Sequence, residues 1–337
     1  MLKDSIVIDE LDRGIVHALH IDGRLPFSRI GEVLGVSTQT VARRYRRLRA
    51  EAGLRVIGSS HLDRDDHTRW LVRLGATAAT ARTLAHSLAR RPDTSWIKLL
   101  SGGTEILLIV RTPLGADAAH SLLLQEIPRT AAITTVSAHY VLHTYLGGPT
   151  PWHGQVATLN EQQRRQLTPN CDGPVSGRGL SSTDDALLAA LQADGRAGLA
   201  ELAAATGWSA ATVARRLADL RARDEIFFDV QVDDTLFGAT TQALLWMSVA
   251  PARLDYVAAE LARHPELAFV HATTGPSNLV AQAMCSGPGA LHHYLTRRLG
   301  HVGDIQALEV TPVLATIKAA GRVTAELPKP VRATHRS

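Results

Sequence analysis

The chain has little of what a disulfide-bonded, zinc-bound or membrane protein needs. It contains only two cysteines, Cys171 and Cys285, which form no CxxC pair, so neither a disulfide framework nor a zinc finger is expected. No run approaches roughly 18 uninterrupted apolar residues, so no membrane span is expected. The N-terminal stretch MLKDSIVIDELDRGI carries Asp4, Glu10 and Asp12 where a signal peptide would need an apolar segment. We therefore expect a cytoplasmic protein.

The composition is that of a globular protein with more than one domain. Of the 337 residues, 45% are hydrophobic and 20% are charged, which is enough to bury a core and argues against disorder. At about 150 residues per domain, two or more domains are expected. The formal charge of +4 permits a polyanionic partner without requiring one.

One sequence unit occurs twice in the chain. TVARRYRRLRA at Thr40–Ala50 is nearly repeated as TVARRLADLRA at Thr212–Ala222. HIDGRLPFSRIGEVLGVS likewise matches QADGRAGLAELAAATGWS, and ARRPDTSWIKLLSGG matches ARHPELAFVHATTGP. Two copies of so large a unit indicate a tandem duplication rather than a solenoid.

Each copy begins with a helical part. In the first copy, IDELDRGIVHALH has the apolar spacing of a helix, and DGR ends it. PFSRIGEVLG predicts a short second helix that ends at Gly35, and Ser37 is suited to cap a third. Val41, Tyr45 and Leu48 form the buried stripe of that third helix. Three helices with a tight turn before the last predict a helix-turn-helix, followed by a short β-wing over LRVIGSSHLD.

The second part of each copy alternates strands and helices. In the first copy the patterns predict strands at 68–74, 95–102, 104–112 and 133–146, and helices at 79–91 and 116–127. The second copy repeats this order from TQALLWMSV to IQALEVTPVLATI. The βαββαβ order is the ferredoxin-like arrangement, with helices on one face of an antiparallel sheet.

The fold class is therefore α+β, with two copies of a winged helix-turn-helix followed by a ferredoxin-like domain. The expected domains are a first helix-turn-helix at 1–62, a first sheet domain at 63–146, a linker at 147–179, a second helix-turn-helix at 180–238 and a second sheet domain at 239–325. The linker is rich in glycine, proline and polar residues, with one short helix expected around LNEQQRRQL.

The third helix of the first copy has the composition of a DNA-reading helix. Between Ser37 and Ala50 it carries five arginines and no acid, together with glutamine and threonine. A solvated helix face is the plain alternative, but such faces usually alternate Lys with Glu. Arginine contacts phosphates and pairs with guanine in the major groove. The residues expected to contact DNA are Ser37, Thr38, Gln39, Thr40, Arg43, Arg44, Arg46 and Arg47.

The matching helix of the second copy has lost part of this pattern. Ala218 and Asp219 stand where the first copy has Arg46 and Arg47, and a carboxylate that faces phosphates is repulsive. We expect this helix to bind the DNA backbone with less base readout, through Thr212, Arg215 and Arg216. The alternative is that the second helix-turn-helix is mainly structural.

Both copies resemble the Lrp/AsnC (feast/famine) transcription regulators, over nearly the whole chain apart from the linker. The resemblance rests on DGR at Asp22–Arg24 and Asp194–Arg196, IGEVLGVSTQTVARRYRRL at Ile30–Leu48, LAAATGWSAATVARRLADL at Leu202–Leu220, and the glycine turns SGGTEILLIV at Ser101–Val110 and TTGPSNLVAQA at Thr273–Ala283. It implies a winged helix-turn-helix joined to a βαββαβ effector and oligomerisation domain. A homo-oligomer through the ferredoxin-like domains is expected, and a tandem chain could also pair its own two sheet domains.

The resemblance also implies a small amino-acid-like effector near the turn between the two middle strands. The family pattern there is a glycine followed three residues later by an acid. Gly102 and Glu105 fit it, and Gly275 fits it, but Asn278 stands where the acid would be. The candidate effector residues are Gly102, Gly103, Glu105, Gly275 and Asn278. The alternative is that these glycines only permit a tight turn with positive φ.

Two other functions compete with a sequence-specific regulator. Sirohaem decarboxylases share this two-part fold and depend on a His-rich final strand. His139 and His143 lie on one face of that strand, without a basic residue between them, and the second copy has no histidine there. A non-specific DNA-bridging protein would need no effector. We expect a sequence-specific regulator that binds double-stranded DNA, with no enzymatic activity, metal or cofactor.

Overall fold

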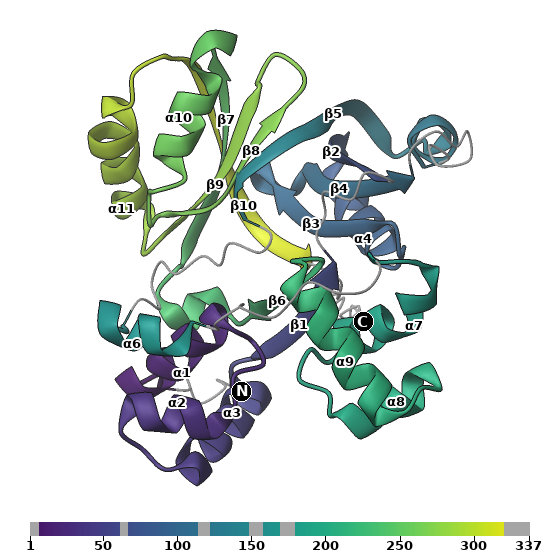
Figure 1. Cartoon of the computed structure of the whole chain (residues 1–337). Helices are drawn as coiled ribbons and strands as arrows, with labels where there is room; N and C mark the ends of the chain where they lie inside the picture. Colours follow the sequence, from purple (N-terminus) through teal and green to yellow (C-terminus); the bar gives the residue numbers. More distant parts are fainter. Residues whose placement is uncertain (1–6, 61–66, 114–121, 148–157, 169–178, 320–337) are drawn as a thin grey trace, which may run out of the picture. The chain divides into compact units, whose positions relative to one another are not determined.

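The computed structural model describes residues 7–60, 67–113, 122–147, 158–168 and 179–319 (Figure 1). The chain divides into two compact units, and strands β5 and β10 each run from one into the other. Unit one comprises Met1–Arg64, His143–Ala272 and Pro276–Glu309, and unit two comprises Asp65–Leu142, Thr273–Gly275 and Val310–Ser337. Within the described residues, no helix is both long enough and apolar enough to cross a membrane.

Unit one contains the first helix-turn-helix, whose helices begin and end at the expected signals. Asp9 and Asp12 form a capping box at the start of the first helix. Gly35 ends the second helix in the left-handed region at φ 68°, and the Ser37 side chain accepts a hydrogen bond from the Thr40 amide. The predicted stripe of the third helix is buried. The helices are α1 (Glu10–Ile21), α2 (Phe27–Leu34) and α3 (Thr38–Glu51).

The second helix-turn-helix, also in unit one, is built with the same caps. Ser181 and Asp184 form a capping box, Gly207 ends the middle helix at φ 72°, and Ser209 caps the third. Its helices are α7 (Asp185–Ala193), α8 (Leu199–Thr206) and α9 (Ala210–Ala222), shown in green in Figure 1. The local signals that the two copies share therefore produce the same three-helix structure twice.

The segment expected to form a wing is a strand whose partner lies in the other copy. Strand β1 (Arg55–Ser60) pairs antiparallel with β6 (Ile226–Gln231), and Ile57 stands opposite Asp229. These two residues are equivalent in the repeat, so the pairing is symmetric about this position. The sequence predicted a short β-wing in the first copy, whereas β1 pairs with β6 and so joins the two helix-turn-helix domains through one two-stranded sheet.

The two DGR motifs hold this pairing together by reciprocal hydrogen bonds. The Arg24 guanidinium donates to the carbonyls of Gly195 and Ala197, at 2.5 and 2.9 Å. Arg196 donates to the carbonyls of the equivalent residues in the first copy, Gly23 at 2.6 Å and Leu25 at 2.9 Å. The same surface is therefore used on both sides, as in an isologous dimer interface.

Ion pairs repeat the same symmetry around the DGR motifs. Arg49 pairs with Asp194 at 3.1 Å, and its equivalent Arg221 pairs with Asp22 at 2.7 Å. The glycines of both motifs are closely packed against the other copy: a Cβ added to Gly195 would come within 3.0 Å of the backbone of the first copy, and one added to Gly23 would lie 2.7 Å from the Phe228 side chain. DGR thus ends a helix and also builds the contact between the copies.

The predicted helix of the linker is present as α6 (Glu161–Leu167) and packs on the first helix-turn-helix. Leu159 and Leu167 belong to the same buried cluster as the α1 and α3 side chains. His17 of α1 accepts hydrogen bonds from the amides of Thr158 and Leu159, at 3.1 and 3.0 Å. This part of the linker is therefore a component of the first domain's core.

Unit two contains the first sheet domain, with the strand order expected for βαββαβ. The order is β3-β4-β2-β5, and β10 joins at the β3 edge, with Val313 opposite Leu100. The predicted helix at 116–127 is described only from Leu122, as Leu122–Glu126 and α5 (Ile127–Arg129). The other elements are β2 (His67–Ala76), α4 (Ala78–Ala89), β3 (Thr94–Leu100), β4 (Glu105–Pro113) and β5 (Ile133–Leu146).

The second sheet domain supplies the remaining strands of unit one. Strand β9 pairs with both β7 and β8 and is buried along its whole length. Helices α10 and α11 lie on the same side of these strands (Figure 1). The elements are β7 (Thr241–Val249), α10 (Leu254–Leu261), β8 (Leu267–Thr273), β9 (Leu279–Cys285), α11 (Pro288–His293) and β10 (Ile305–Lys318).

The reciprocal arginines should be the main polar support of the paired helix-turn-helix domains. Arg24→Ala removes two hydrogen bonds from a charged donor and leaves two carbonyls without that partner, so we expect the paired domains to lose about 2–3 kcal/mol of unfolding free energy. Arg196→Ala should cost at least as much, since Arg196 also lies over the Phe27 ring at 4.4 Å.

Hydrogen exchange of β1 and β6 in increasing urea measures this loss. Arg263→Ala is the control, because Arg263 is exposed and its one ion pair within the described residues is with its helical neighbour Glu260, a contact worth about 0.2–1 kcal/mol. If the amides of β1 and β6 are protected from exchange equally well in the Arg24→Ala and Arg263→Ala variants, the assigned role of the DGR motifs is wrong.

Candidate nucleic-acid interface and effector turn

Helix α3 presents a polar outer face on its solvent side. Ser37, Thr38 and Gln39 are exposed at its N-terminal end, and Arg43 and Arg46 are exposed further along. Arg46 makes one long hydrogen bond, from Nε to the Ala42 carbonyl at 3.4 Å. No carboxylate in the described part of the chain pairs with either arginine. Their charges are therefore available to a ligand.

Two other arginines of α3 are held inside the domain. Arg44 pairs with Asp9 at 2.7 Å and with Asp12 at 3.3 Å, and Arg47 also pairs with Asp12. The Asp12 side chain is completely buried. Both arginines thus fasten α3 to the start of α1. The sequence analysis expected Arg43, Arg44, Arg46 and Arg47 all to contact DNA. It did so without knowledge of these acids, which hold Arg44 and Arg47 but not the other two.

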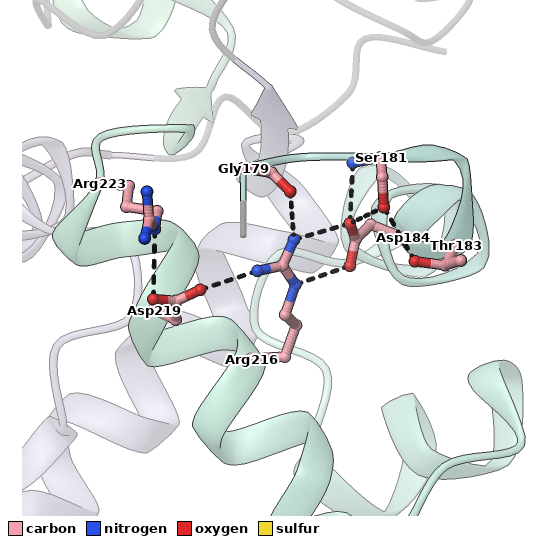
Figure 2. Close-up of polar contacts among 7 residues, drawn as sticks. All are labelled: Gly179, Ser181, Thr183, Asp184, Arg216, Asp219 and Arg223. Atoms are coloured by element: carbon pink, nitrogen blue, oxygen red, sulfur yellow. Dashed lines mark hydrogen bonds and ion pairs between the residues drawn. The ribbon is translucent and has the colours of Figure 1, made fainter. Parts of the chain in front are cut away.

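Arg216 makes the equivalent contact in the second copy (Figure 2). It donates to both oxygens of the buried Asp184 at 2.8 Å, to Asp219 at 2.8 Å and to the Gly179 carbonyl at 2.9 Å. Asp219 also accepts from Arg223 at 3.3 Å. The Asp219 charge, expected to repel phosphates, is therefore compensated by two guanidinium groups.

The outer face of α9 is poorer in polar groups than that of α3. Ala210, Ala211 and Ala218 are exposed where α3 has Thr38, Gln39 and Arg46. Arg215 is exposed like its equivalent Arg43. Thr212 and Thr40 are half-buried, and each is hydrogen-bonded to its capping serine. One exposed arginine without an ion pair in the described residues remains on α9, against two on α3.

The two buried acids titrate differently because their neighbours differ. Burial acts to raise the pKa of Asp184, but hydrogen bonds from Arg216 and Ser181 outweigh burial and hold it below its usual value. Burial raises the pKa of Asp12, and the adjacent Asp9 carboxyl adds to this rise. The second copy has Ser181 where the first has Asp9. Asp184 therefore has no carboxyl at the position from which Asp9 raises the pKa of Asp12.

The turn at the first candidate effector site has positive φ and is followed by an ion pair. Ser101, Gly102 and Gly103 have φ of 48°, 72° and 86°. Glu105, which begins β4, pairs with Arg73 of β2; Arg73 Nη2 lies 3.1 Å from Glu105 Oε2. The Ser101 hydroxyl donates to the same oxygen at 3.0 Å. A carboxylate and a guanidinium therefore stand together beside the turn.

The residues of the second candidate turn are used by the fold. Asn278 accepts a hydrogen bond from the Val249 amide at 2.9 Å and donates to its carbonyl at 2.8 Å. Gly275 has φ 103°, and a Cβ there would lie 2.3 Å from Nδ1 of His139. Glycine is thus needed at 275 both for its conformation and for space.

The histidines of β5 have local partners. His139 lies 2.6 Å from the Ser137 hydroxyl, and burial lowers the pKa of its imidazole. His143 is exposed and packs edge-on against Tyr145. Among the described residues, no group of three His, Cys, Asp or Glu side chains is placed to hold a metal ion.

Sequence reasoning did not identify the acids that hold the arginines. Asp12 and Asp184 occupy equivalent positions and are buried in both copies. The signal was available in the repeat: each acid is followed by an arginine, Arg44 or Arg216, at the same distance along the chain. An acid and a base retained together in both copies are candidates for a structural pair.

Comparison with known proteins supports the two-copy interpretation. Residues 8–49 and 180–221 match the AsnC-type helix-turn-helix domain, and residues 242–323 match the Lrp/AsnC ligand binding domain. The HTH-type transcriptional regulator FL11 of Pyrococcus horikoshii is 29% identical over 150 residues, which are 44% of this chain and 96% of that protein. FL11 of Pyrococcus furiosus is 28% identical with the same coverage. Nearly a whole relative thus matches less than half of this chain, as a tandem duplication requires.

One solved structure resembles almost the whole chain. Siroheme decarboxylase NirDL superposes with a TM-score of 0.59 over 94% of this chain and 94% of that one, at 12% identity. At this identity the likeness shows a shared fold and nothing about activity.

The Asp184–Arg216 contact should stabilise the second helix-turn-helix in a pH-dependent way. Asp184→Asn removes one of the two carboxylates paired with Arg216, and Asp219 remains, so we expect a loss of about 1–3 kcal/mol at pH 7. Because the folded-state pKa of Asp184 is lowered, its contribution is fully present above about pH 4 and is lost as the pH falls through the folded-state value.

Hydrogen exchange of α7 and α9 at pH 7 and in a series down to pH 3 tests both statements. Asp185→Asn is the matched control, since Asp185 is exposed and directly adjacent. A difference between wild type and Asp184→Asn that stays constant across this range would show that the ionised carboxylate is not the source of the stability.

Proposed function

The chain is a tandem Lrp/AsnC-type protein with two AsnC-type helix-turn-helix domains and an Lrp/AsnC ligand binding domain, and we propose that it is a sequence-specific DNA-binding transcription regulator controlled by a small amino-acid-like effector. The observation that carries the DNA-binding part is the exposed face of α3. There Gln39, Arg43 and Arg46 stand free on the third helix of a helix-turn-helix. We place the protein in the cytoplasm, with the DNA it would regulate.

The chemistry of this face suits base edges as well as phosphates. Arginine can pair with guanine through two hydrogen bonds, and glutamine can do so with adenine. The N-terminal Ser37, Thr38 and Thr40 suit phosphate oxygens, which accept hydrogen bonds from hydroxyls at a helix N-terminus. In the second copy, Thr212 and Arg215 would make the corresponding contacts.

The remaining candidate arginines would act mainly by positioning. Arg44, Arg47 and Arg216 are engaged by buried acids, so moving them to DNA would leave those carboxylates buried without a counter-charge, which is costly. They fix α3 and α9 on their domains, and their charge adds to the local potential. We therefore assign direct contact to Arg43, Arg46 and Arg215.

The first glycine turn is the better of the two effector candidates. Glu105 could hold an ammonium group and Arg73 a carboxylate if a zwitterion exchanged places with their ion pair, and the Gly102 and Gly103 amides lie at the same turn. Asn278 has no charge and already uses both polar atoms on Val249. We therefore assign effector binding to the first sheet domain.

We also propose a homo-oligomer through the sheet domains. Their final strands expose large apolar side chains at equivalent positions: Val136 and Leu142 on β5 are 50% and 62% exposed, and Leu308 and Leu314 on β10 are 40% and 57% exposed. Exposed apolar side chains gathered on one element favour burial against a partner.

A regulator is favoured over an enzyme of the same fold by the residues rather than by the architecture. The fold is common to regulators and to a decarboxylase, so it decides nothing alone. The free arginine face of α3 has a direct use on DNA. His139 is hydrogen-bonded to Ser137, and its ring lies where a side chain at position 275 would stand. A Soret band shifted by this protein in a titration with an iron tetrapyrrole would support the enzyme instead.

Removal of the free arginines should weaken DNA binding selectively. With Arg43→Ala and Arg46→Ala combined, each lost guanine contact should cost about 1–3 kcal/mol, and each lost phosphate contact should lower the salt slope by about 0.9. Arg215→Ala should reduce affinity without relaxing sequence preference. Fluorescence anisotropy at several salt concentrations, on a site selected from random DNA and on its scrambled form, measures both quantities.

Arg263→Ala again serves as control, because it removes one exposed positive charge far from any proposed contact in the sequence. If Arg263→Ala and the α3 double variant weaken DNA binding equally, the loss of affinity comes from the lower net charge and not from contacts of α3. Equal loss of specificity by Arg215→Ala would show that the two copies read bases alike.

Effector binding should depend on the Glu105 carboxylate. Calorimetric titration with individual amino acids should detect a binding step in the wild type that is lost in Glu105→Gln, because the neutral amide cannot balance an ammonium charge. Ser101→Ala is the control, since it removes only the hydroxyl bonded to Glu105. An unchanged step in Glu105→Gln rejects this site, and a wild type silent toward all amino acids rejects the effector class.

A further inference from the structure

We propose that this chain recognises an asymmetric DNA site, made of two unlike half-sites: α3 reads bases in one, and α9 holds chiefly the backbone of the other. This inference rests on the proposed DNA-binding function and specifies its ligand. One chain would occupy the whole site in one orientation.

The first step is that the two helix-turn-helix domains are paired as in a two-fold dimer. The contacts of Arg24 and Arg196 are reciprocal, as are the ion pairs of Arg49 and Arg221. Ile57 faces its equivalent Asp229 at the centre of the β1–β6 pair. Paired helix-turn-helix domains place their recognition helices on two half-sites, and symmetric proteins therefore bind palindromes.

The second step is that the faces presented by this symmetric pair are unlike. The copies keep the charged residues that make the reciprocal contacts: Asp22 and Asp194, Arg24 and Arg196, Arg49 and Arg221. The three exposed polar side chains Thr38, Gln39 and Arg46 are each replaced by alanine on α9. Alanine offers no hydrogen bond to a base edge. The two halves therefore differ in what they can read, while their pairing is preserved.

The third step is that the second domain retains the internal support of a working recognition helix. Asp184 and Arg216 repeat the Asp12–Arg44 contact, and the Ser209 cap repeats that of Ser37. The Asp219 charge is balanced by Arg216 and Arg223. The face of α9 is thus held firmly and left with Arg215 as its exposed cation, as backbone contact requires.

The fourth step is that residue 229 disfavours a symmetric alternative. If the second domains of two chains paired with each other in the same register, Asp229 would stand opposite Asp229. Like charges directly opposite in a strand pair are destabilising. The observed pairing sets Asp229 against the neutral Ile57. First-with-second pairing is therefore selected over second-with-second.

Selection of binding sites from random duplex DNA by the full-length protein tests the inference. We expect one conserved half-site and one poorly conserved half-site at a fixed distance. In the selected sequence, scrambling the conserved half should weaken binding at least tenfold, since each wrong base pair costs about 1–3 kcal/mol. Scrambling the other half should weaken it less than about threefold.

A gain-of-function variant tests whether the face of α9 determines the second half-site, without relying on a loss of binding. Ala210→Thr, Ala211→Gln and Ala218→Arg together give α9 the exposed polar groups of α3, and all three positions are exposed, so the fold should be retained. Selection with this variant should yield a palindromic motif. Arg263→Ala should yield the wild-type motif.

The outcomes separate this inference from the proposed function. A palindromic motif from the wild type would overturn the inference and leave sequence-specific binding intact. An asymmetric wild-type motif that stays unchanged in the triple variant would also overturn it, because α9 would not be the reader of the second half. Absence of any enriched sequence would overturn sequence-specific binding itself, and the inference with it.

Discussion

The reciprocal hydrogen bonds of the two DGR motifs are the constraint on which the arrangement of the helix-turn-helix domains depends. Arg24 and Arg196 each satisfy two carbonyls of the opposite copy, and the adjacent glycines allow the backbones to approach. Both arginines are half-buried, and a guanidinium withdrawn from water needs such partners, because an unsatisfied charge there is costly. The motif can therefore change in neither copy without loss in the other. Residues outside this contact are free to diverge, and the exposed face of the third helix is one place where the copies differ.

The elements that could be predicted from the sequence are those fixed by local signals. Gly35 and Ser37 determine where α2 ends and α3 begins, and the observed bounds of β5 and β7 agree with their apolar patterns. Partners distant in sequence carry no such signal. The β1–β6 pairing and the docking of α6 were missed because strand pairing and linker packing depend on the other elements present. For the same reason, Arg47 was expected to contact DNA, and its ion pair with the buried Asp12 was not foreseen.

The candidate site shows the same division between local and distant information. The sequence placed Gly102 and Glu105 at one turn, and the structure has them there with positive φ at the glycine. It did not reveal that Arg73, from a different strand, already neutralises Glu105. An isolated carboxylate would attract any cation, whereas a carboxylate beside a guanidinium is suited to a ligand that carries both charges. The distant partner thus changes which ligand the turn fits.

Divergence of the two copies follows one direction at both proposed sites. On the recognition helix, Arg46 of the first copy corresponds to Ala218 of the second, and at the glycine turn Glu105 corresponds to Asn278. In each case the first copy has a charged group at the proposed site, and the second copy has a neutral residue, which at Asn278 is hydrogen-bonded to the backbone of Val249. The buried acid of the second copy, Asp184, is nevertheless kept. Duplication allows such a division because a homodimer must change both subunits together. One chain can keep a symmetric frame and concentrate ligand recognition in half of it.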